Sequence, residues 1–233
     1  NIKDVPLSRW LSSQFKVPVY IQNELNVCAL AELTYGNLHL ENDVIFITCY
    51  EGVKASVVVD GRILSGYHGT FGAIGHFSVV ENGPPCTCGS KGCLEMYASG
   101  RALRKTIAAK VNENPELLTN YTLLEPAELF KQAAEGDSFC QEIVEAAVPH
   151  MALAFASLMR LTDIEHIILL GIYSGGGVYL QNLLAENIAP RLPKTIRKNL
   201  RIRIGSKHSS ETLVVAAALP AIQGFFEPKT TTV

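Results

Sequence analysis

Hydrophobic and polar positions along the chain fall into two alternating kinds of block. Short runs rich in β-branched and other apolar residues predict strands, because a buried strand presents apolar side chains over about four to eight residues. These runs are residues 17–22, 44–50, 55–60, 166–171 and 200–205. The Asp60-Gly61 pair after the third run predicts a tight turn into RILSG, and therefore a β-hairpin.

Between the strands, apolar residues recur at helical spacing. The predicted helices cover residues 4–15, 26–35, 94–111, 178–199 and 211–225, with two more across 127–161. Gly36 is expected to end the second helix, Gly100 to interrupt the third, and a break is expected near Pro193. A polar connection is expected at 112–126 and a disordered tail at 229–233. Hairpins combined with strand-helix alternation predict an α/β protein with a mixed sheet.

The composition is that of an ordinary globular protein. With 233 residues, 48% of them hydrophobic and 18% charged, the chain can build one large core or two smaller lobes. A formal net charge of −2 gives no general attraction for nucleic acid or for an anionic membrane, so the expected partner is a small molecule or a protein. No apolar run approaches the roughly 18 residues of a membrane span, and no charged-then-apolar leader opens the chain. Cys28, Cys49 and Cys140 lie singly in apolar contexts, which favours a reducing compartment, the cytoplasm, over a disulfide framework.

The basic run RLPKTIRKNLRIR at residues 191–203 has two interpretations. It could contact nucleic acid, or it could be a solvated helix face followed by a half-exposed strand. The second is favoured, because apolar residues such as Leu192, Ile196 and Ile202 are interleaved with the cations.

The stretch GHFSVVENGPPCTCGSKGC at residues 75–93 carries the clearest chemical signal. It places four potential metal ligands close together in the sequence, namely His76, Cys86, Cys88 and Cys93. Thiolates and imidazole suit a tetrahedral Zn²⁺ ion, and Gly89 and Gly92 allow the backbone to fold tightly around it. Four protein ligands leave no open position for water, which favours a structural zinc over a catalytic one. The alternative is two buried cysteines and an unrelated third.

Four motifs follow one another along the chain: QNELNVCALAE at 22–32, DGR at 60–62, GAIGH at 72–76 and CTCGSKGCLE at 86–95. Their order resembles that of the ROK family of bacterial sugar kinases and sugar-responsive transcriptional repressors of the xylose- and N-acetylglucosamine-repressor type. The resemblance extends from about residue 5 to residue 225. It implies a two-lobed actin-like or hexokinase-like (ribonuclease H-like) fold, with a sugar held in the cleft between the lobes.

The resemblance also implies a division of the chain. Residues 1–22 would be the end of the small lobe, and residues 23–207 the large lobe with the zinc knuckle and the sugar cleft. Residues 208–228 would be a helix that returns to the small lobe. Neither an Asp-x-Gly-Gly motif nor a basic helix-turn-helix occurs before residue 17, and the chain begins with Asn1 rather than Met. We therefore expect it to be the C-terminal part of a longer protein.

Four residues take sugar-binding roles from the resemblance. Asn23 matches the residue that hydrogen-bonds sugar hydroxyls, and Glu24 stands where the kinases carry their catalytic Asp. His76 matches a residue that binds zinc through one ring nitrogen and faces the sugar with the other, and Glu95 matches a second carboxylate on the hydroxyls. Zinc would hold the imidazole in a fixed orientation for its ligand. The alternatives are a helix N-cap for Asn23 or Glu24, and a first-turn carboxylate favoured by the helix dipole for Glu95.

Departures from the family pattern separate an enzyme from a sensor. ROK kinases carry a glycine-rich phosphate loop resembling G-T-G-x-G-x-G, which aligns here with Tyr50, Glu51, Gly52, Val53, Lys54, Ala55 and Ser56. Only Gly52 remains, and Glu51 would bring a carboxylate toward a polyphosphate. Lys54 offsets part of that repulsion. ATP is therefore not expected to bind.

Three further departures point the same way or change the expected ligand. The glycines of GIYSGGG, at residues 171–177, are displaced from the end of the preceding strand. Glu24 is one methylene longer than a catalytic Asp, which displaces a general base beyond the tolerance of such geometry. Ala73 stands where family members usually have a sugar-contacting Glu. The effector therefore differs from glucose-like sugars, binds weakly, or is absent.

The sequence thus favours a non-catalytic, sugar-sensing effector-binding and oligomerisation region of a ROK-type transcriptional repressor, with a structural zinc. Its expected partners are a monosaccharide or sugar phosphate, further copies of the chain in a dimer or tetramer, and DNA only through a helix-turn-helix upstream. No contact with a membrane is expected. The first alternative is an ATP-dependent sugar kinase of the same family, and the second is a structural protein that has lost its ligand.

Overall fold

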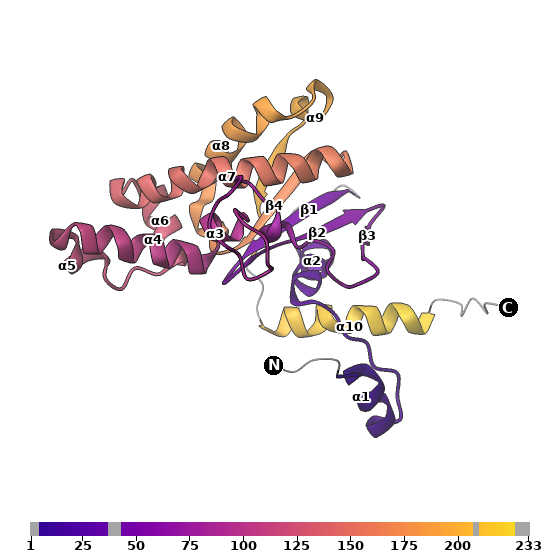
Figure 1. Cartoon of the computed structure of the whole chain (residues 1–233). Helices are drawn as coiled ribbons and strands as arrows, with labels where there is room; N and C mark the ends of the chain where they lie inside the picture. Colours follow the sequence, from indigo (N-terminus) through magenta and orange to yellow (C-terminus); the bar gives the residue numbers. More distant parts are fainter. Residues whose placement is uncertain (1–4, 37–42, 207–209, 227–233) are drawn as a thin grey trace. The chain divides into compact units, whose positions relative to one another are not determined.

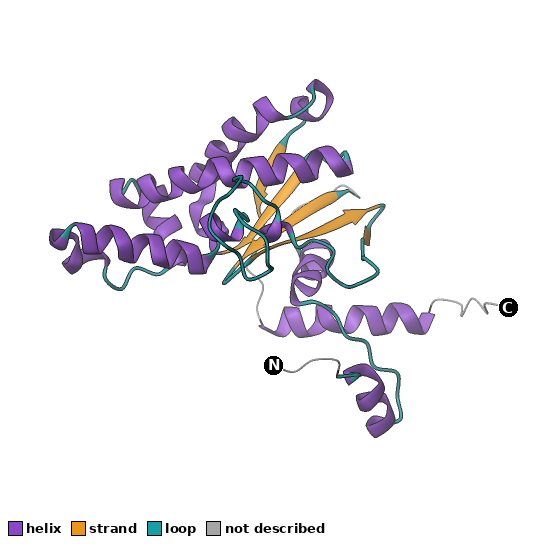
Figure 2. Cartoon of the chain, in the orientation of Figure 1, coloured by secondary structure: helices purple, strands orange, loops and turns teal. Residues whose placement is uncertain are grey.

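The structure is a computed structural model that describes residues 5–36, 43–206 and 210–226. The chain divides into two compact units, Asn1–His39 with Ser206–Val233, and Leu40–Gly205. Figure 1 traces the elements along the chain, and Figure 2 separates helices from strands.

The larger unit contains a mixed five-stranded sheet with strand order β3-β2-β1-β4-β5 (Figure 2). The strands are β1 (Val44–Cys49), β2 (Val53–Val59), β3 (Arg62–Ile63), β4 (His166–Gly171) and β5 (Arg201–Ile204). β1 pairs antiparallel with β2 and parallel with β4, and β4 pairs parallel with β5. The predicted mixed sheet and the predicted hairpin after Asp60-Gly61 are therefore confirmed, although β3 is shorter than RILSG.

The larger unit also contains seven helices among the residues that the structure describes. They are α3 (Glu95–Ala98), α4 (Gly100–Glu113), α5 (Leu118–Tyr121), α6 (Pro126–Glu135), α7 (Ser138–Thr162), α8 (Gly177–Ile188) and α9 (Lys194–Lys198). Short 3₁₀ turns complete it: η1 (Ile74–His76), η2 (Pro115–Leu117), η3 (Ile172–Gly176) and η4 (Ala189–Arg191). Ile45 and Ile47 of β1 join one continuous hydrophobic core with residues of α4, α6, α7 and α8. β1 is buried along its whole length, as expected of a central strand.

The helix α7 is the longest element of the core. Asp137 caps its N-terminus by accepting a hydrogen bond from the amide of Cys140 at 2.9 Å. By length and composition α7 could cross a membrane, although polar residues interrupt its apolar stretches. Within the protein, however, 61% of that stretch is buried, as is usual for a core helix.

The predicted interruption in the helix at 94–111 occurs one residue earlier than expected. Ser99 ends α3 and caps α4, because its Oγ accepts a hydrogen bond from the amide of Ala102 at 3.1 Å. Gly100 is instead the first residue of α4, and its amide donates to the carbonyl of Tyr50 at 2.9 Å. The break therefore anchors the start of α4 to the end of β1.

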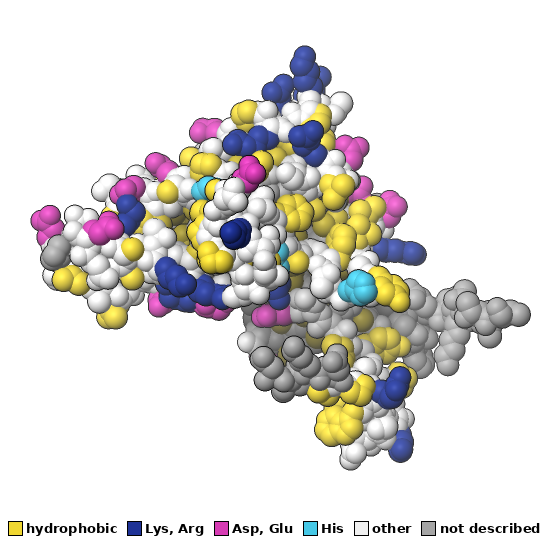
Figure 3. Space-filling model, viewed as in Figure 1, with side chains coloured by type: hydrophobic (Ala, Val, Ile, Leu, Met, Phe, Trp, Pro, Cys, Tyr) yellow, Lys and Arg dark blue, Asp and Glu magenta, His cyan; other side chains and the backbone are white. Residues whose placement is uncertain are grey.

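The predicted break near Pro193 is confirmed. α8 ends at Ile188, η4 follows, and α9 begins at Lys194. Leu192 and Ile196 are buried while most of the neighbouring cations are exposed, so the basic run is a solvated face on an apolar base. Figure 3 shows Lys and Arg side chains gathered at the surface around α9.

The smaller unit contains α1 (Leu7–Phe15), α2 (Glu24–Tyr35) and α10 (Ser210–Phe226), and α2 packs against α10. Glu32 of α2 is fully buried, and its carboxylate accepts hydrogen bonds from the amide and the hydroxyl of Ser206, at 2.8 and 3.1 Å. Gly36 caps the C-terminus of α2, as predicted. The lobe boundaries expected at residues 22–23 and 207–208 stay predictions, and the expected disordered tail at 229–233 lies outside the described residues.

The strand predicted at residues 17–22 is wrong. This segment has no regular secondary structure and most of its side chains are exposed. The Val19 carbonyl accepts from Ser8 Oγ at 2.7 Å, and its amide donates to Ser12 Oγ at 3.1 Å. Pro18 supplies no amide, and among residues 5–36 and 210–226 there is no strand with which the segment could pair. An apolar, β-branched run cannot by itself show whether a partner strand exists.

Candidate metal centre and the adjoining polar site

A knuckle formed by residues 76–93 brings the four predicted metal ligands together. The ligand atoms of His76, Cys86, Cys88 and Cys93 all lie within 4.8 Å of one another. Cys86 Sγ is 3.6 Å from His76 Nδ1, and Cys88 Sγ is 3.6 Å from Cys93 Sγ. A tetrahedral Zn²⁺, with Zn–S near 2.3 Å and Zn–N near 2.0 Å, sets S···N and S···S separations of roughly 3.6 to 3.8 Å. The cluster could therefore hold a metal ion, and its geometry and donor set fit zinc.

Local sequence explains why the knuckle closes. The amide of Cys86 donates to the carbonyl of Ser90 at 2.8 Å, and the amide of Gly89 returns to the carbonyl of Cys86 at 3.0 Å. Gly92 has a positive φ of 64°, and a Cβ there would lie 1.7 Å from the carbonyl oxygen of Val80. No residue with a side chain fits that position. The path of the backbone therefore requires glycine at position 92, whereas Gly89 is favoured by its positive φ of 93° alone.

The thiols of the cluster have different proton affinities. For Cys86, burial raises the pKa, but hydrogen bonds from the Cys88 amide, from the thiols of Cys88 and Cys93 and from the His76 ring lower it to about 7. For Cys93, burial together with hydrogen bonds to the other two thiols raises the pKa to about 12. A bound divalent cation favours the thiolate at every such position.

Glu95 lies beside the knuckle at the start of α3. Its Oε2 is 3.4 Å from His76 Nδ1, and its Oε1 is 3.8 Å from Arg101 Nη2. A Cβ on Gly52 would lie 2.2 Å from Glu95 Oε1, so the carboxylate occupies the space above that glycine. The Glu95 side chain is 15% exposed and that of His76 41%, which leaves both accessible to a small ligand. The structure thus brings together two of the four predicted sugar ligands, and Glu95 is also the first-turn carboxylate of the alternative interpretation.

Asn23 and Glu24 belong to the smaller unit. Asn23 caps α2, because its Oδ1 accepts a hydrogen bond from the amide of Leu25 at 3.0 Å, and this confirms the N-cap interpretation. Glu24 is exposed in the first turn of the same helix. Their role in binding a sugar together with residues of the larger unit stays a prediction.

The turn between β1 and β2, residues 50–52, lies where the phosphate loop was aligned. Arg104 of α4 holds the Glu51 carboxylate with two hydrogen bonds, from Nη2 to Oε1 at 2.6 Å and from Nη1 to Oε2 at 3.0 Å. The same guanidinium binds Glu125 Oε2 through Nε at 2.9 Å. Hydrogen bonds from Arg104 lower the pKa of Glu51, so this exposed carboxylate stays ionised. Sequence reasoning missed Arg104 and Glu125, because no local pattern links residues that lie this far apart.

The end of β4 is closed by a buried tyrosine. Tyr173 of η3 donates from its hydroxyl to the carbonyl of Ala98 at 2.9 Å and meets Phe130 edge-on. Burial raises its pKa well above the ordinary value. Cys49 Sγ also donates to the Ala98 carbonyl, at 3.5 Å. The start of the segment after β4 is therefore held in place by the Tyr173 side chain, ahead of the glycines at 175–177.

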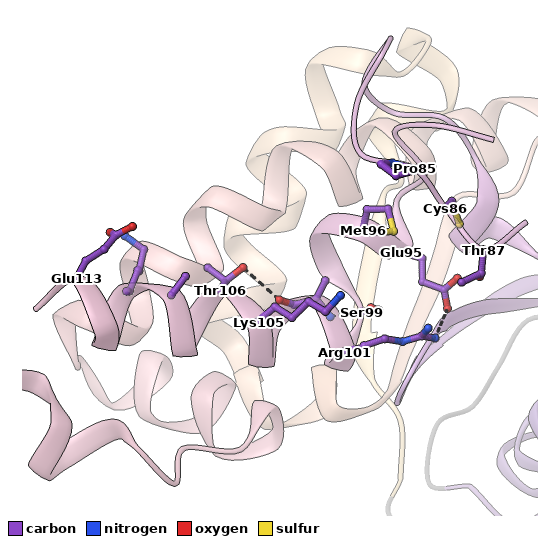
Figure 4. A pocket seen from close by; sticks show the side chains of 13 residues that line it. Pro85, Cys86, Thr87, Glu95, Met96, Ser99, Arg101, Lys105, Thr106 and Glu113 are labelled. Atoms are coloured by element: carbon purple, nitrogen blue, oxygen red, sulfur yellow. Dashed lines mark hydrogen bonds and ion pairs between the residues drawn. The ribbon is translucent and has the colours of Figure 1, made fainter. Parts of the chain in front are cut away.

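A groove of about 550 Å³ runs from the knuckle along α3 and α4 (Figure 4). It is lined by Pro85, Cys86, Thr87, Glu95, Met96, Ser99, Arg101, Ala102, Lys105, Thr106, Ala109, Lys110 and Glu113. Glu95 thus lines the groove as well as contacting His76. Sequence reasoning did not find this groove, because its lining joins an irregular loop to one face of a helix.

A family model described as the ROK family matches residues 1–222 of the chain. The chain belongs to the ROK family. A glucokinase of Halalkalibacterium halodurans is 33% identical over 182 residues, which cover 76% of this chain and 54% of that protein. A xylose repressor of Caldicellulosiruptor bescii is 30% identical over 175 residues, 72% of this chain and 44% of that protein. The chain thus spans about half the length of these curated relatives.

Solved structures agree with this assignment. A ROK family transcriptional regulator, described as a homolog of the E. coli MLC protein, superposes with a TM-score of 0.85 at 25% identity, over 95% of this chain and 56% of that one. The ROK hexokinase from Thermus thermophilus superposes with a TM-score of 0.75 at 28% identity, over 94% of this chain and 70% of that one. The predicted actin-like, hexokinase-like fold is therefore confirmed. The relatives of this ROK chain include both repressors and kinases.

Proposed function

We propose that this ROK chain is the sugar-sensing effector-binding and oligomerisation region of a transcriptional repressor, that it lacks catalytic activity, and that a structural zinc stabilises it. The observation that carries the proposal is the β1–β2 turn. A phosphate loop needs bare backbone amides at close approach to the nucleotide. Here the turn presents the Glu51 carboxylate, which two hydrogen bonds from Arg104 hold in its ionised form.

Gly52 does not weaken this proposal. It is the one glycine that survives from the phosphate-loop pattern, and its lack of a side chain is explained by Glu95, whose Oε1 would lie 2.2 Å from a Cβ at that position. Glycine at position 52 is therefore explained by the space that the Glu95 carboxylate occupies, and its presence does not imply that the turn binds a nucleotide.

The proposed zinc is held by His76, Cys86, Cys88 and Cys93. Of the two imidazole nitrogens, Nδ1 is the one 3.6 Å from Cys86 Sγ, so we assign it as the ligand atom and leave Nε2 for the effector. When bound, zinc supplies a fixed imidazole orientation and a cross-link between loop segments. Elemental analysis of the purified protein should give about one zinc per chain.

The proposed effector is a monosaccharide or sugar phosphate whose hydroxyls are bound by His76 and Glu95, with Asn23 and Glu24 contributing from the smaller unit. Carboxylate, amide and imidazole groups recognise hydroxyls because they accept or donate hydrogen bonds in fixed directions. Glu95 Oε2 lies 3.4 Å from Nδ1, on the zinc side of the His76 ring, so the carboxylate is close enough to this side chain for one ligand to reach both Glu95 and Nε2. Ala73, in place of an additional carboxylate, argues for an effector other than a glucose-like sugar.

Sensing would follow from a shift between two conformations, one of which binds the effector more tightly. Assembly into a dimer or tetramer, action in the cytoplasm and DNA contact through an upstream helix-turn-helix complete the proposal. These parts draw support from similarity to xylose repressors and to the ROK family regulator.

The test combines binding with turnover. Zinc-loaded protein is titrated with a panel of hexoses and pentoses by calorimetry, and ATP consumption is followed in a coupled assay with the same panel. We expect binding of at least one sugar and no turnover. Turnover that disappears in Glu24→Gln would contradict the sensor and establish the kinase, whereas no response to any sugar or sugar phosphate would favour a structural protein.

The second candidate, an ATP-dependent sugar kinase, is favoured by the glucokinase that is 33% identical over 76% of this chain. An N-acetylmannosamine kinase of Vibrio cholerae, 33% identical over 82% of the chain, adds to it. Lys54 follows the β1–β2 turn as an exposed cation that could meet a phosphate. The ATP-consumption assay separates the two candidates directly.

A further inference from the structure

The groove along α4 carries two cations at the end where Glu95 lies. Arg101 and Lys105 are separated by one helical turn, about 6 Å along the axis. Figure 4 shows the Lys105 side chain extending toward the end of the groove that holds Arg101 and Glu95. Met96 and Ala102 supply apolar lining between the charged groups.

These two cations differ from Lys110, which lies further along the groove and pairs with Glu142 at 2.6 Å. The Lys105 side chain has no ion pair or hydrogen bond among residues 5–36, 43–206 and 210–226. The contact of Arg101 with Glu95 is long, at 3.8 Å, and its side chain is half exposed. A guanidinium has five N–H donors, so most of them remain available to a ligand. Two like charges at i and i+4 also repel each other until an anion joins them.

We infer that this end of the groove binds the phosphate of a sugar phosphate whose hydroxyls meet Glu95. A phosphate monoester presents three acceptor oxygens, which suit the planar fork of Arg101 and the point charge of Lys105. Glu95 lines the groove and lies 3.4 Å from His76, so one molecule reaches both the proposed sugar ligands and the cations. The inference rests on the proposed function for the sugar half of the ligand and selects the phosphorylated class of effector.

The experiment uses the zinc-loaded full chain and pairs of ligands that differ only in the phosphate. Glucose is compared with glucose 6-phosphate and xylose with xylose 5-phosphate, by calorimetry at low and at physiological salt. We expect a phosphorylated member to bind at least about tenfold more tightly than its partner, and the difference to shrink as salt screens the charges. Inorganic phosphate and MgATP are titrated as probes of phosphate from other sources.

Lys105→Gln is the deciding variant, because the Lys105 side chain is exposed and has no ion pair or hydrogen bond among the described residues. It should reduce the phosphate advantage about tenfold and leave binding of the plain sugar unchanged. Arg101→Lys keeps the charge but loses the fork, so it should remove part of the advantage. Lys91→Gln, an exposed knuckle lysine outside the groove lining, is the matched control and should change neither.

The outcomes separate the inference from the function on which it rests. Equal binding of plain and phosphorylated sugars would overturn the phosphate site and leave the sugar sensor standing. No binding of any sugar or sugar phosphate would overturn both. Binding of inorganic phosphate or MgATP as tight as that of the sugar phosphate, weakened by Lys105→Gln, would show a phosphate site that serves another ligand and would contradict the sugar-phosphate assignment.

Discussion

The knuckle and the β1–β2 turn meet at Glu95, yet they relate to the ROK pattern in opposite ways. In the knuckle every residue expected for a metal site is present, and the four ligand atoms converge to within 4.8 Å. In the turn one glycine of the phosphate pattern remains, and a Glu51–Arg104 ion pair stands in the loop. The knuckle, which we propose shapes a sugar pocket, keeps the family pattern, while the turn that aligns with the phosphate loop carries side chains in place of glycines. Such a contrast is expected of a protein that has kept binding and given up phosphoryl transfer.

The largest expected effect comes from the knuckle. Cys88→Ser should lose the metal and much of the fold, because binding energy at a structural zinc site is folding energy. We expect the melting temperature to fall by more than about 10 °C. Elemental analysis and a thermal melt measure the two effects, and Cys28→Ser, outside the knuckle, is the control that should retain zinc. A metal-free variant with unchanged stability would contradict a structural role for zinc in the knuckle.

Glu95 tests whether the turn and the knuckle serve one pocket. Gly52→Ala places a methyl group on the carboxylate and should weaken effector binding about tenfold, with little change in thermal stability because the tip of Glu95 can move. When Gly52→Ala is combined with Glu95→Ala, it should not weaken effector binding further, because the carboxylate that the methyl group would displace is no longer present. Calorimetry on the unaltered protein, the two single variants and the double variant gives the coupling free energy between positions 52 and 95 in effector binding. Additive losses would show that Gly52 acts by some other route.

The ion pair at the turn is expected to matter less. Glu51→Thr removes the carboxylate from the phosphate-loop position and should raise the affinity for MgATP by about threefold to tenfold without turnover. Stability should change little, because the pair is exposed to solvent. Glu125→Gln removes the other carboxylate on Arg104 and leaves the turn as it is, so it should not raise the affinity. Tight MgATP binding by the unaltered protein would contradict the proposal that the β1–β2 turn no longer receives a nucleotide.

Asn23 provides the smallest and most selective test. Asn23→Ala should destabilise the protein by about 1 kcal/mol through loss of the α2 cap, as read from denaturant unfolding. Asn23→Asp keeps the capping oxygen but loses the amide donor, so stability should be retained while effector affinity falls about threefold to tenfold. Retained affinity in Asn23→Asp would leave Asn23 with its capping role alone.

Much of the larger unit could be predicted because its signals are local. The four candidate metal ligands fall within a short stretch of sequence that closes on itself through backbone hydrogen bonds, so their spacing alone predicted that they come together. The strands 44–49 and 166–171 were found because a central strand is apolar throughout. The cap at Ser99 was missed by one residue, since the glycine beside it carries the more familiar signal for a break.

What could not be predicted depends on contacts between distant segments. Glu51 and Arg104 are far apart in sequence, and nothing near either residue indicates the other. The packing of Glu95 over Gly52 joins a helix start to a strand turn in the same way. At residues 17–22 the pattern was apolar but the pairing strand was lacking among the described residues, so the backbone of Val19 bonded to the serines of α1 instead.

The Ala98–Gly100 junction between α3 and α4 has a mechanical consequence. The Ala98 carbonyl receives Tyr173 and Cys49, and the Gly100 amide donates to Tyr50, so the junction is tied to the carboxyl ends of β1 and β4. A ligand bound by Glu95 at the start of α3 would therefore act on a helix whose end is hydrogen-bonded to the sheet, so any tilt of α3 would strain these bonds or move the strand ends with it.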